Sequence, residues 1–597
     1  MRWRDSIICF LCFVVAVALL IAANGRLEYI NAARKEMKLV INEPLENAPP
    51  SLAFASVAMG AFRGLLVDVL WMRMDKLKEQ GQFFDAKQTA EWITTLQPRF
   101  AEVWDFQAWN MAYNISVAMP ATQPAERWRW VKNGIELLRD QAIVKNPKNI
   151  GLYRSLGWIF QHKMGGVTDD CHKYYKLQLA LAMQPLISPS PDKPPTNEFF
   201  KELAEAPKEW QQIIKDPQVA AFVDALKKAD PNFVGKDDAF ITSYLSLRQM
   251  PGRFSPVVFA VVDRFRDSPA LKKFDTFAKA FELQTTWKLD PSLMQDLNQR
   301  YGPIDYNDPN QREPLNWEHP DVHAMYWAAL GLKMGSKSEY SADEINTDRI
   351  VMHGLQDLFR NGKMIIYDTP VEQKGSSSQP PQVIKTVFLF PDLQMFEPYD
   401  RVVRATIEKY RKMKDDTTSL ENGHRNMLTN AVVSFYQAGH EPYALKIYNE
   451  LRRLYPRQQF NVPLEVYVKN QIREDLRSIT ITDAVEMIVM MLREGYRAYA
   501  LHNDDEAYRN EKMAKEIYDN YQAQWQDEKV LRVDLPRDFG MMRFIALNSF
   551  LNDEMFPPNL RLALLGRMKL ERPQLFQQME DIVKKLQEEA NQKAEQK

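Results

Sequence analysis

The sequence predicts an all-α protein built from paired helices, with a helical insertion and one small β-hairpin. Apolar residues recur at steps of three and four over most of the 597 residues, which is the spacing of one buried helix face. The 27 methionines and 13 tryptophans favour large, irregular contacts between helices, and 22 glycines are few for a β-sandwich or a phosphate-cradling enzyme. A chain of this length exceeds a single ordinary core, so we expect several packed units or a repeat array.

The charge and cysteine content argue against several classes of function. With 77 basic and 78 acidic residues the net charge is −1, whereas a general nucleic-acid binder needs a basic face that displaces counterions. Cys9 and Cys12 form a C-x-x-C spacing inside an apolar run, where a thiolate would be desolvated. Cys171 then has no partner for an internal disulfide. We therefore expect no nucleic-acid partner and no metal. The sequence also contains no P-loop, G-x-G-x-x-G or G-x-S-x-G motif, so we expect no cofactor and no catalytic residues.

The first 25 residues read as a transmembrane anchor or a signal sequence. Arg2 and Arg4 precede an uncharged apolar run at residues 7–23, which as a helix is about 25 Å long and just spans a bilayer core. The sequence Ala-Asn-Gly at 23–25 matches a cleavage site poorly, which favours the uncleaved anchor. We expect a single-pass protein of the cytoplasmic membrane whose body lies on the extracytoplasmic (periplasmic) side. A polar, proline-rich linker follows at 26–51.

Residues 52–186 contain three consecutive pairs of helical periods. The predicted ranges are 52–80 with 83–97, 101–113 with 125–145, and 150–164 with 169–184. The third pair carries Tyr153, Leu156, Gly157 and Phe160 on its first helix, Ala180 on its second helix, and a closing Pro185. The second pair has the matching residues Trp104, Ala108, Met111, Ala142 and Pro147, and the first pair keeps Ala86, Leu96 and Pro98.

These rings, small residues and closing prolines resemble the tetratricopeptide repeat (TPR), a 34-residue helix–turn–helix unit. Residues 393–525 contain a further copy at 428–456 and a looser pair at 483–522. The copy without a gap has Leu428, Ala431, Val432, Phe435, Gly439, Ala444, Tyr448, Leu451 and Pro456 in place. The resemblance implies a diverged TPR-like α-solenoid in which the rings pack between helices. Uneven spacing of the closing prolines shows that insertions interrupt the ideal period.

The remaining segments interrupt or end the helix pairs. Residues 187–360 read as a helical insertion with short helices and long loops. Residues 361–392 read as a β-hairpin, with strands at 363–369 and 384–390 around a flexible loop rich in serine and proline. Residues 526–597 are expected to form C-terminal helices and a charged tail.

Two histidines of the insertion, His319 and His323, are the strongest candidates for chemistry. They are four residues apart, as metal ligands on one helix face often are. However, Pro320 and Asp321 mark a helix start, with a proline in the first turn and an acidic residue near the positive helix end. We therefore interpret the histidines as packing and capping residues. The alternative is an enzyme or carbohydrate-binding protein with a site at 290–355.

The TPR resemblance also implies a binding groove. In that family, first-helix residues one turn away from the core line a concave wall that holds peptides. The corresponding residues are Asp105, Trp109, Tyr113, Arg154, Trp158 and Gln161. Two tryptophans on an exposed wall are costly unless something covers them. Either a partner covers them, or the insertion at 187–360 folds back over them.

From these observations we expect a non-catalytic scaffold or adaptor. It would be held at the membrane through residues 7–23 and would present helical surfaces to other envelope proteins or peptides. Binding would follow the mode of the repeat family, with an extended or helical segment clamped in a groove.

Overall fold

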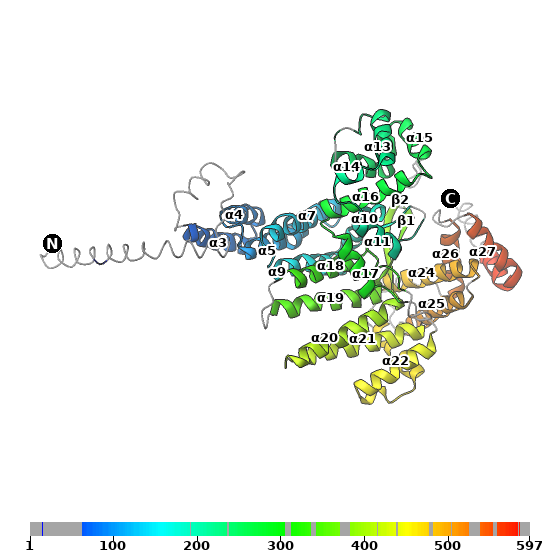
Figure 1. Ribbon diagram of the computed structural model, residues 1–597. Coiled ribbons are helices and arrows are strands. Elements are labelled where there is room, and N and C mark those ends of the chain that lie inside the picture. Colours follow the sequence, from blue (N-terminus) through cyan, green and yellow to red (C-terminus); the bar gives the residue numbers. More distant parts are fainter. Residues whose placement is uncertain are drawn as a thin grey trace, which may run out of the picture. The chain divides into compact units, whose positions relative to one another are not determined.

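The structure is a computed structural model, and its described part is largely helical (Figure 1). It describes residues 63–190, 193–233, 235, 238–304, 312–335, 342–370, 383–414, 416–437, 440–476, 481–502, 504–524, 538–552, 558–582 and 584, together with Val15. The predicted anchor and linker lie outside these residues, apart from Val15. No helix formed by the described residues is long and apolar enough to cross a bilayer. The chain divides into two compact units, residues 1–100 and 101–597, and each is described by itself.

The first unit contains a helix hairpin. Helices α3 (Arg63–Glu79) and α4 (Phe83–Leu96) pack against each other. The turn between them places Gly81 at φ +71°, a backbone conformation that glycine adopts without steric cost. Helix α4 ends at Leu96, one residue before the predicted end at 97 and two before Pro98. The pair predicted at 52–80 and 83–97 is therefore observed from residue 63 onward.

The second unit begins with three helices that change from α- to π-type hydrogen bonding along their length. They are α5 (Ala101–Trp109) continued by η2 (Asn110–Ile115) and α6 (Ser116–Ala118), α7 (Pro124–Glu136) continued by η3 (Leu137–Ala142) and α8 (Ile143–Lys145), and α9 (Ile150–Trp158) continued by η4 (Ile159–Gly165). Helix α10 (His172–Ile187) follows. A π segment adds a residue to a turn and so rotates the side chains that come after it.

The predicted packing residues of these helices form a core. Trp104, Tyr153, Leu156 and Phe160 are all buried. Gly157 allows a close approach, because a Cβ at this position would lie 3.1 Å from the carbonyl oxygen of Ala324 on another helix. The interpretation of the rings and the small residue as interhelix contacts is confirmed.

Pro185 does not close its helix. It lies inside α10, which continues to Ile187. Proline removes one backbone donor and restricts the residue before it, but the last turn of a helix tolerates both effects better than the middle does. The prediction that this proline marks the helix end was therefore wrong by two residues.

The insertion contains its own hydrophobic core. Its helices are α11 (Asn197–Glu205), α12 (Trp210–Ile213), α13 (Pro217–Ala229), α14 (Asp238–Gln249), η5 (Pro251–Arg253), α15 (Pro256–Arg264), α16 (Pro269–Thr285), α17 (Pro291–Tyr301), α18 (Pro320–Met334) and α19 (Ala342–Asn361). Aromatic rings from α12 to α16 pack edge to face, including Trp210, Phe240 and Phe274. This core is separate from the main core of the second unit.

Five of the insertion helices begin with the same capping pattern. Each has proline in its first turn and a preceding side chain that accepts a hydrogen bond from a backbone N–H two residues further on. The capping residues are Asp216, Ser255, Ser268, Asp290 and His319. The predicted helix start at Pro320 is thus confirmed.

A two-stranded antiparallel hairpin follows the insertion. Strand β1 (Lys363–Pro370) pairs with β2 (Val383–Phe390), with Lys363 opposite Phe390. These strands coincide with the predicted ones to within one residue at each end. The predicted loop between them lies outside the described residues.

The C-terminal part returns to packed helices. It comprises η6 (Leu393–Met395), α20 (Phe396–Lys412), α21 (Thr418–Gln437), α22 (Glu441–Leu454), η7 (Gln458–Phe460), α23 (Leu464–Leu476), α24 (Ile481–Ala500), α25 (Asp504–Gln524), α26 (Phe539–Asn552) and α27 (Pro558–Glu571). The predicted pairs are observed as α21 with α22 and α24 with α25. Helices α9, α18, α19, α20, α21 and α22 form a series in which each packs on the next (Figure 1).

Candidate functional site

The residues of the predicted groove lie on two neighbouring helices of the second unit. Trp109 and Tyr113 come from α5 and η2, and Trp158 comes from α9. The rings of Trp109 and Tyr113 stack at 4.1 Å between centroids, with an interplanar angle of 19°. Trp109 remains 44% exposed, although it belongs to an ordered stack. This ring is the most exposed aromatic side chain among the six predicted groove residues.

His162, which the sequence did not single out, connects the two helices. Its ring stacks on Trp158 at 4.9 Å, and its Nδ1 lies 3.3 Å from the hydroxyl oxygen of Tyr113. Burial and the charge of Lys163 lower the pKa of His162, which favours the neutral imidazole. Trp109, Tyr113, His162 and Trp158 therefore form a continuous row of rings, which we call the aromatic row.

The other three predicted groove residues make contacts inside the protein. The side chain of Asp105 forms a hydrogen bond with Ser155, and burial raises the pKa of the Asp105 carboxyl group. Arg154 forms an ion pair with Asp343 of α19. The Nε2 of Gln161 donates a hydrogen bond to the carbonyl oxygen of Ile350, also on α19, at 3.0 Å. The insertion thus contacts this wall at Arg154 and Gln161.

A second notable feature is a buried lysine at the junction of α10, η4, α18 and α19. The side chain of Lys176 is fully buried, and its Nζ donates to the carbonyl oxygen of Gly166 at 3.0 Å. It also lies 2.9 Å from the Nδ1 of His172. Burial lowers the pKa of Lys176 to about 8, although the charges of Asp321 and Asp357 act in the opposite direction.

Asp321 occupies the first turn of α18 at the same junction. It is fully buried, and neither carboxylate oxygen accepts a hydrogen bond from any described residue. A Cβ at position 165 would lie 2.8 Å from its Oδ2, so Gly165 leaves room for the carboxylate. Burial and the charge of Asp321 raise the pKa of Asp357 to about 7. Lys176 and Asp357, whose pKa values are shifted, thus lie near one buried carboxylate, a pattern found at functional sites and in structural networks.

The two candidate histidines have structural partners. His319 caps α18, because its Nδ1 accepts a hydrogen bond from the backbone N–H of Asp321 at 3.3 Å. The Nε2 of His323 lies 2.9 Å from the carbonyl oxygen of Trp317, and burial lowers the pKa of His323 to about 4. Each histidine thus has one polar partner within the fold, while the Nε2 of His319 and the Nδ1 of His323 are buried without a hydrogen-bond partner among the described residues. In the part of the chain that the structure describes, no three His, Cys, Asp or Glu side chains are arranged to hold a metal ion.

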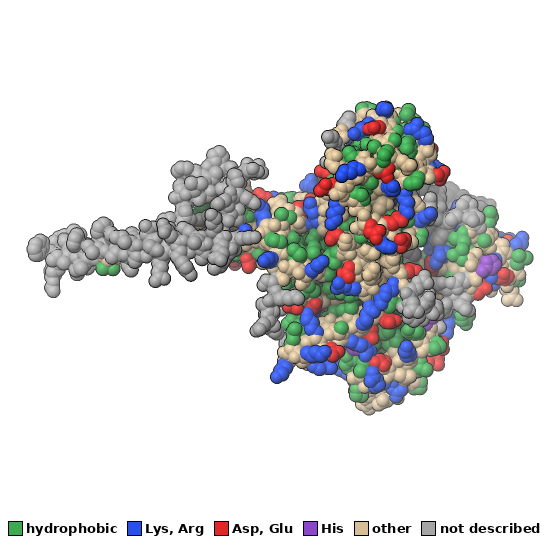
Figure 2. Space-filling view, viewed as in Figure 1, with side chains coloured by type: hydrophobic (Ala, Val, Ile, Leu, Met, Phe, Trp, Pro, Cys, Tyr) green, Lys and Arg blue, Asp and Glu red, His purple; other side chains and the backbone are tan. Residues whose placement is uncertain are grey.

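Surface charge on the second unit is mixed. Basic and acidic side chains are interspersed over the face shown in Figure 2. The comparison with known proteins gives no further guidance, because neither a protein-family model nor a curated protein matches the sequence. The structure shows a largely helical protein with packed helix pairs, and the TPR resemblance depends on residue spacing alone.

Proposed function

We propose that this protein is a membrane-anchored extracytoplasmic scaffold or adaptor that binds other envelope proteins or peptides through TPR-like helix pairs. Residues 7–23 would hold it in the membrane. The observation that carries the proposal is the exposure of Trp109 at the end of the aromatic row. Tryptophan is among the side chains that contribute most to protein interfaces when a partner buries it.

The aromatic row supports binding because it is already ordered. Trp109 stacks on Tyr113, and Tyr113 contacts His162. A ring held in place before association loses little conformational entropy when a partner covers it. Its remaining exposed area is available for burial at about 25 cal/mol per Å². A partner that covers Trp109 would therefore gain hydrophobic contact at a small ordering cost.

The contacts of α19 determine which part of the groove a partner would use. Arg154 and Gln161 already bind Asp343 and Ile350 within the protein. No described residue binds Trp109 in this way, and its side chain is 44% exposed. We therefore place the partner at the Trp109 end of the wall and not along its full length.

A photocrosslinking amino acid at position 109 of the full-length protein tests this proposal in native membranes. We expect a discrete crosslink to a second protein. The same probe at Val144, which is 64% exposed on α8, serves as the control and should give none. Substitution Tyr113→Ala, which removes the ring below Trp109, should weaken the crosslink. Intramolecular products alone at position 109 would rule out this surface as a partner site.

The alternative is an enzyme or carbohydrate-binding protein with its site at 290–355. The observation that favours it is Asp321, whose buried carboxylate oxygens lack a hydrogen-bond donor among the described residues. Purified full-length protein would be analysed for bound metal and sugars, beside the variants Asp321→Asn and His319→Ala. A stoichiometric ligand that both substitutions remove would favour this alternative over the scaffold.

A further inference from the structure

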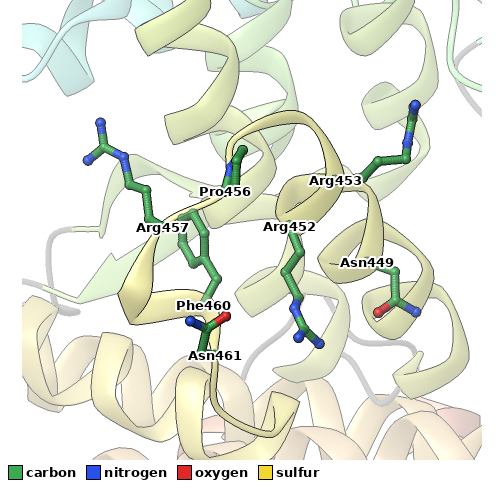
Figure 3. A pocket seen from close by; sticks show the side chains of 7 residues that line it. All are labelled: Asn449, Arg452, Arg453, Pro456, Arg457, Phe460 and Asn461. Atoms are coloured by element: carbon green, nitrogen blue, oxygen red, sulfur yellow. The ribbon is translucent and has the colours of Figure 1, made fainter.

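A basic surface pocket of about 380 Å³ lies at the C-terminal end of α22. Its lining residues are Asn449, Arg452, Arg453, Pro456, Arg457, Phe460 and Asn461 (Figure 3). The turn below it is held to the helix, because the hydroxyl group of Tyr448 lies 3.0 Å from the carbonyl oxygen of Phe460 and 2.9 Å from that of Val462. Phe460 is buried against the ring of Tyr467. The pocket therefore has a fixed floor and an open, polar rim.

The arginines at the rim carry more positive charge than the neighbouring carboxylates neutralise. Arg453 pairs with Glu450 at 2.7 Å, and Glu450 is shared with Arg404 at 3.2 Å. Arg452 and Arg457 have no carboxylate partner among the described residues. The guanidinium group of Arg452 lies 5.7 Å from the ring of Tyr448, a contact that leaves its N–H donors available. Two exposed arginines are thus free to bind anionic groups.

The helix dipole explains two of the three arginines at the pocket. Arg452 and Arg453 lie in the last turn of α22, where positive charge favours the helix dipole. Arg457 lies beyond the helix end at Leu454 and gains nothing from this effect. It nevertheless lines the same pocket. The dipole therefore does not account for the grouping of all three.

The directions of the side chains indicate what kind of anion fits. In Figure 3 the guanidinium groups of Arg453 and Arg457 extend to opposite sides of the pocket, and that of Arg452 points in a third direction. A single small anion cannot contact groups that diverge in this way. A chain with carboxylates spaced along it can contact them in turn, with charge-assisted hydrogen bonds at each.

We propose that this pocket binds an acidic, extended segment of a partner protein, with carboxylates of the segment on Arg452 and Arg457. The amides of Asn449 and Asn461 supply further hydrogen bonds to its backbone. The inference does not depend on the aromatic row, which lies on α5, η2, α9 and η4. Loss of one surface should leave the other intact.

The test is binding of a fluorescein-labelled oligoglutamate peptide to full-length protein in detergent micelles, measured by fluorescence anisotropy. The wild type should bind at low salt and release the peptide as salt is added. The double variant R452Q/R457Q should bind at least about tenfold more weakly, because two charge-assisted contacts are lost. The matched control K208Q/K228Q removes the same charge from two exposed positions, one just before α12 and one on α13, and should bind like the wild type.

Three results would overturn the proposal. The first is an equal loss in both double variants, which would indicate non-specific attraction. The second is binding of inorganic phosphate or phosphatidylglycerol vesicles that depends on Arg452 and Arg457 while oligoglutamate does not bind. The third is unchanged peptide binding by R452Q/R457Q. Circular dichroism of each variant, and the single variant Arg457→Gln, separate a loss of contacts from a loss of folding.

Discussion

Lys176 and His172 stand one turn apart on α10, and the Nζ of Lys176 lies 2.9 Å from the Nδ1 of His172. Burial and the lysine charge lower the pKa of His172 to about 4, so the neutral imidazole accepts a hydrogen bond from the ammonium group. The negative charges that act on the lysine come from Asp321 on α18 and Asp357 on α19. Ionisable side chains of α10, α18 and α19 thus form one buried network, and the protonation of this network depends on pH.

The first prediction is that the free energy of unfolding rises with pH through the titration of Lys176. Its pKa is about 8 in the folded protein and 10.5 as the reference value. Between these values the unfolded chain binds more protons, so raising the pH favours the folded state. From pH 7.5 to 9.5 the contribution is about 2 kcal/mol. In urea denaturation, the free energy of unfolding should rise less with pH for Lys176→Met than for the wild type. An equal rise with pH in both proteins would contradict the titration of a buried lysine.

The second prediction has the opposite sign and concerns Asp357. Its pKa is about 7 in the folded protein against a reference of 3.8, because of burial and Asp321. Between these values the folded state holds the extra proton, so stability falls as pH rises from 5 to 8. The gain in unfolding free energy that Asp357→Asn gives over the wild type should therefore be larger at pH 8 than at pH 5 by about 1 to 3 kcal/mol. Asp224→Asn, on the surface of α13, is the matched control for removing one carboxylate.

A third prediction concerns the segment that leads into α18. The fully buried Asn298 accepts hydrogen bonds at its Oδ1 from the backbone N–H of Leu315 at 3.1 Å and the indole N–H of Trp317 at 2.9 Å. Asn298→Ala leaves both donors buried without a partner and should cost about 2 to 4 kcal/mol. Asn422→Ala, at an exposed position on α21, should cost less than about 0.5 kcal/mol. Comparable losses in thermal denaturation would show that Asn298 is not a structural anchor.

The sequence predicted helix pairs because their signals are local. Tyr153, Leu156 and Phe160 repeat at helical spacing, and each is buried. The cap and proline at His319 and Pro320 also act within a few residues, and the predicted helix start is observed.

Contact of the insertion with the groove wall was one of two outcomes that the sequence left open, but the residues that make this contact could not be predicted in this way. The contacts of Arg154 with Asp343 and of Gln161 with Ile350 each join residues 189 positions apart. Periodicity does not specify which distant helix fills a given groove. Nor does it reveal a π segment or the burial of Lys176, since a lysine on a helix is usually at the surface. Long-range packing decided these features.

The fourth prediction follows from the contact between α9 and α18. A Cβ at Gly331 would lie 2.6 Å from the Cβ of Tyr153 and 3.0 Å from its Cγ, which is a buried and rigid part of the side chain. Gly331→Ala should therefore separate the helices and destabilise the protein by about 1 to 3 kcal/mol. Gly423 on α21 has nothing within 4 Å of the same position, so Gly423→Ala should stabilise by about 0.5 to 1 kcal/mol through helix propensity. Opposite shifts of the urea midpoint would establish that glycine at 331 is required by close packing, since both substitutions add the same methyl group to a helix. Shifts of the same sign would mean that α18 can move away from Tyr153 without loss, and that the spacing of small residues is not what brings these helices together.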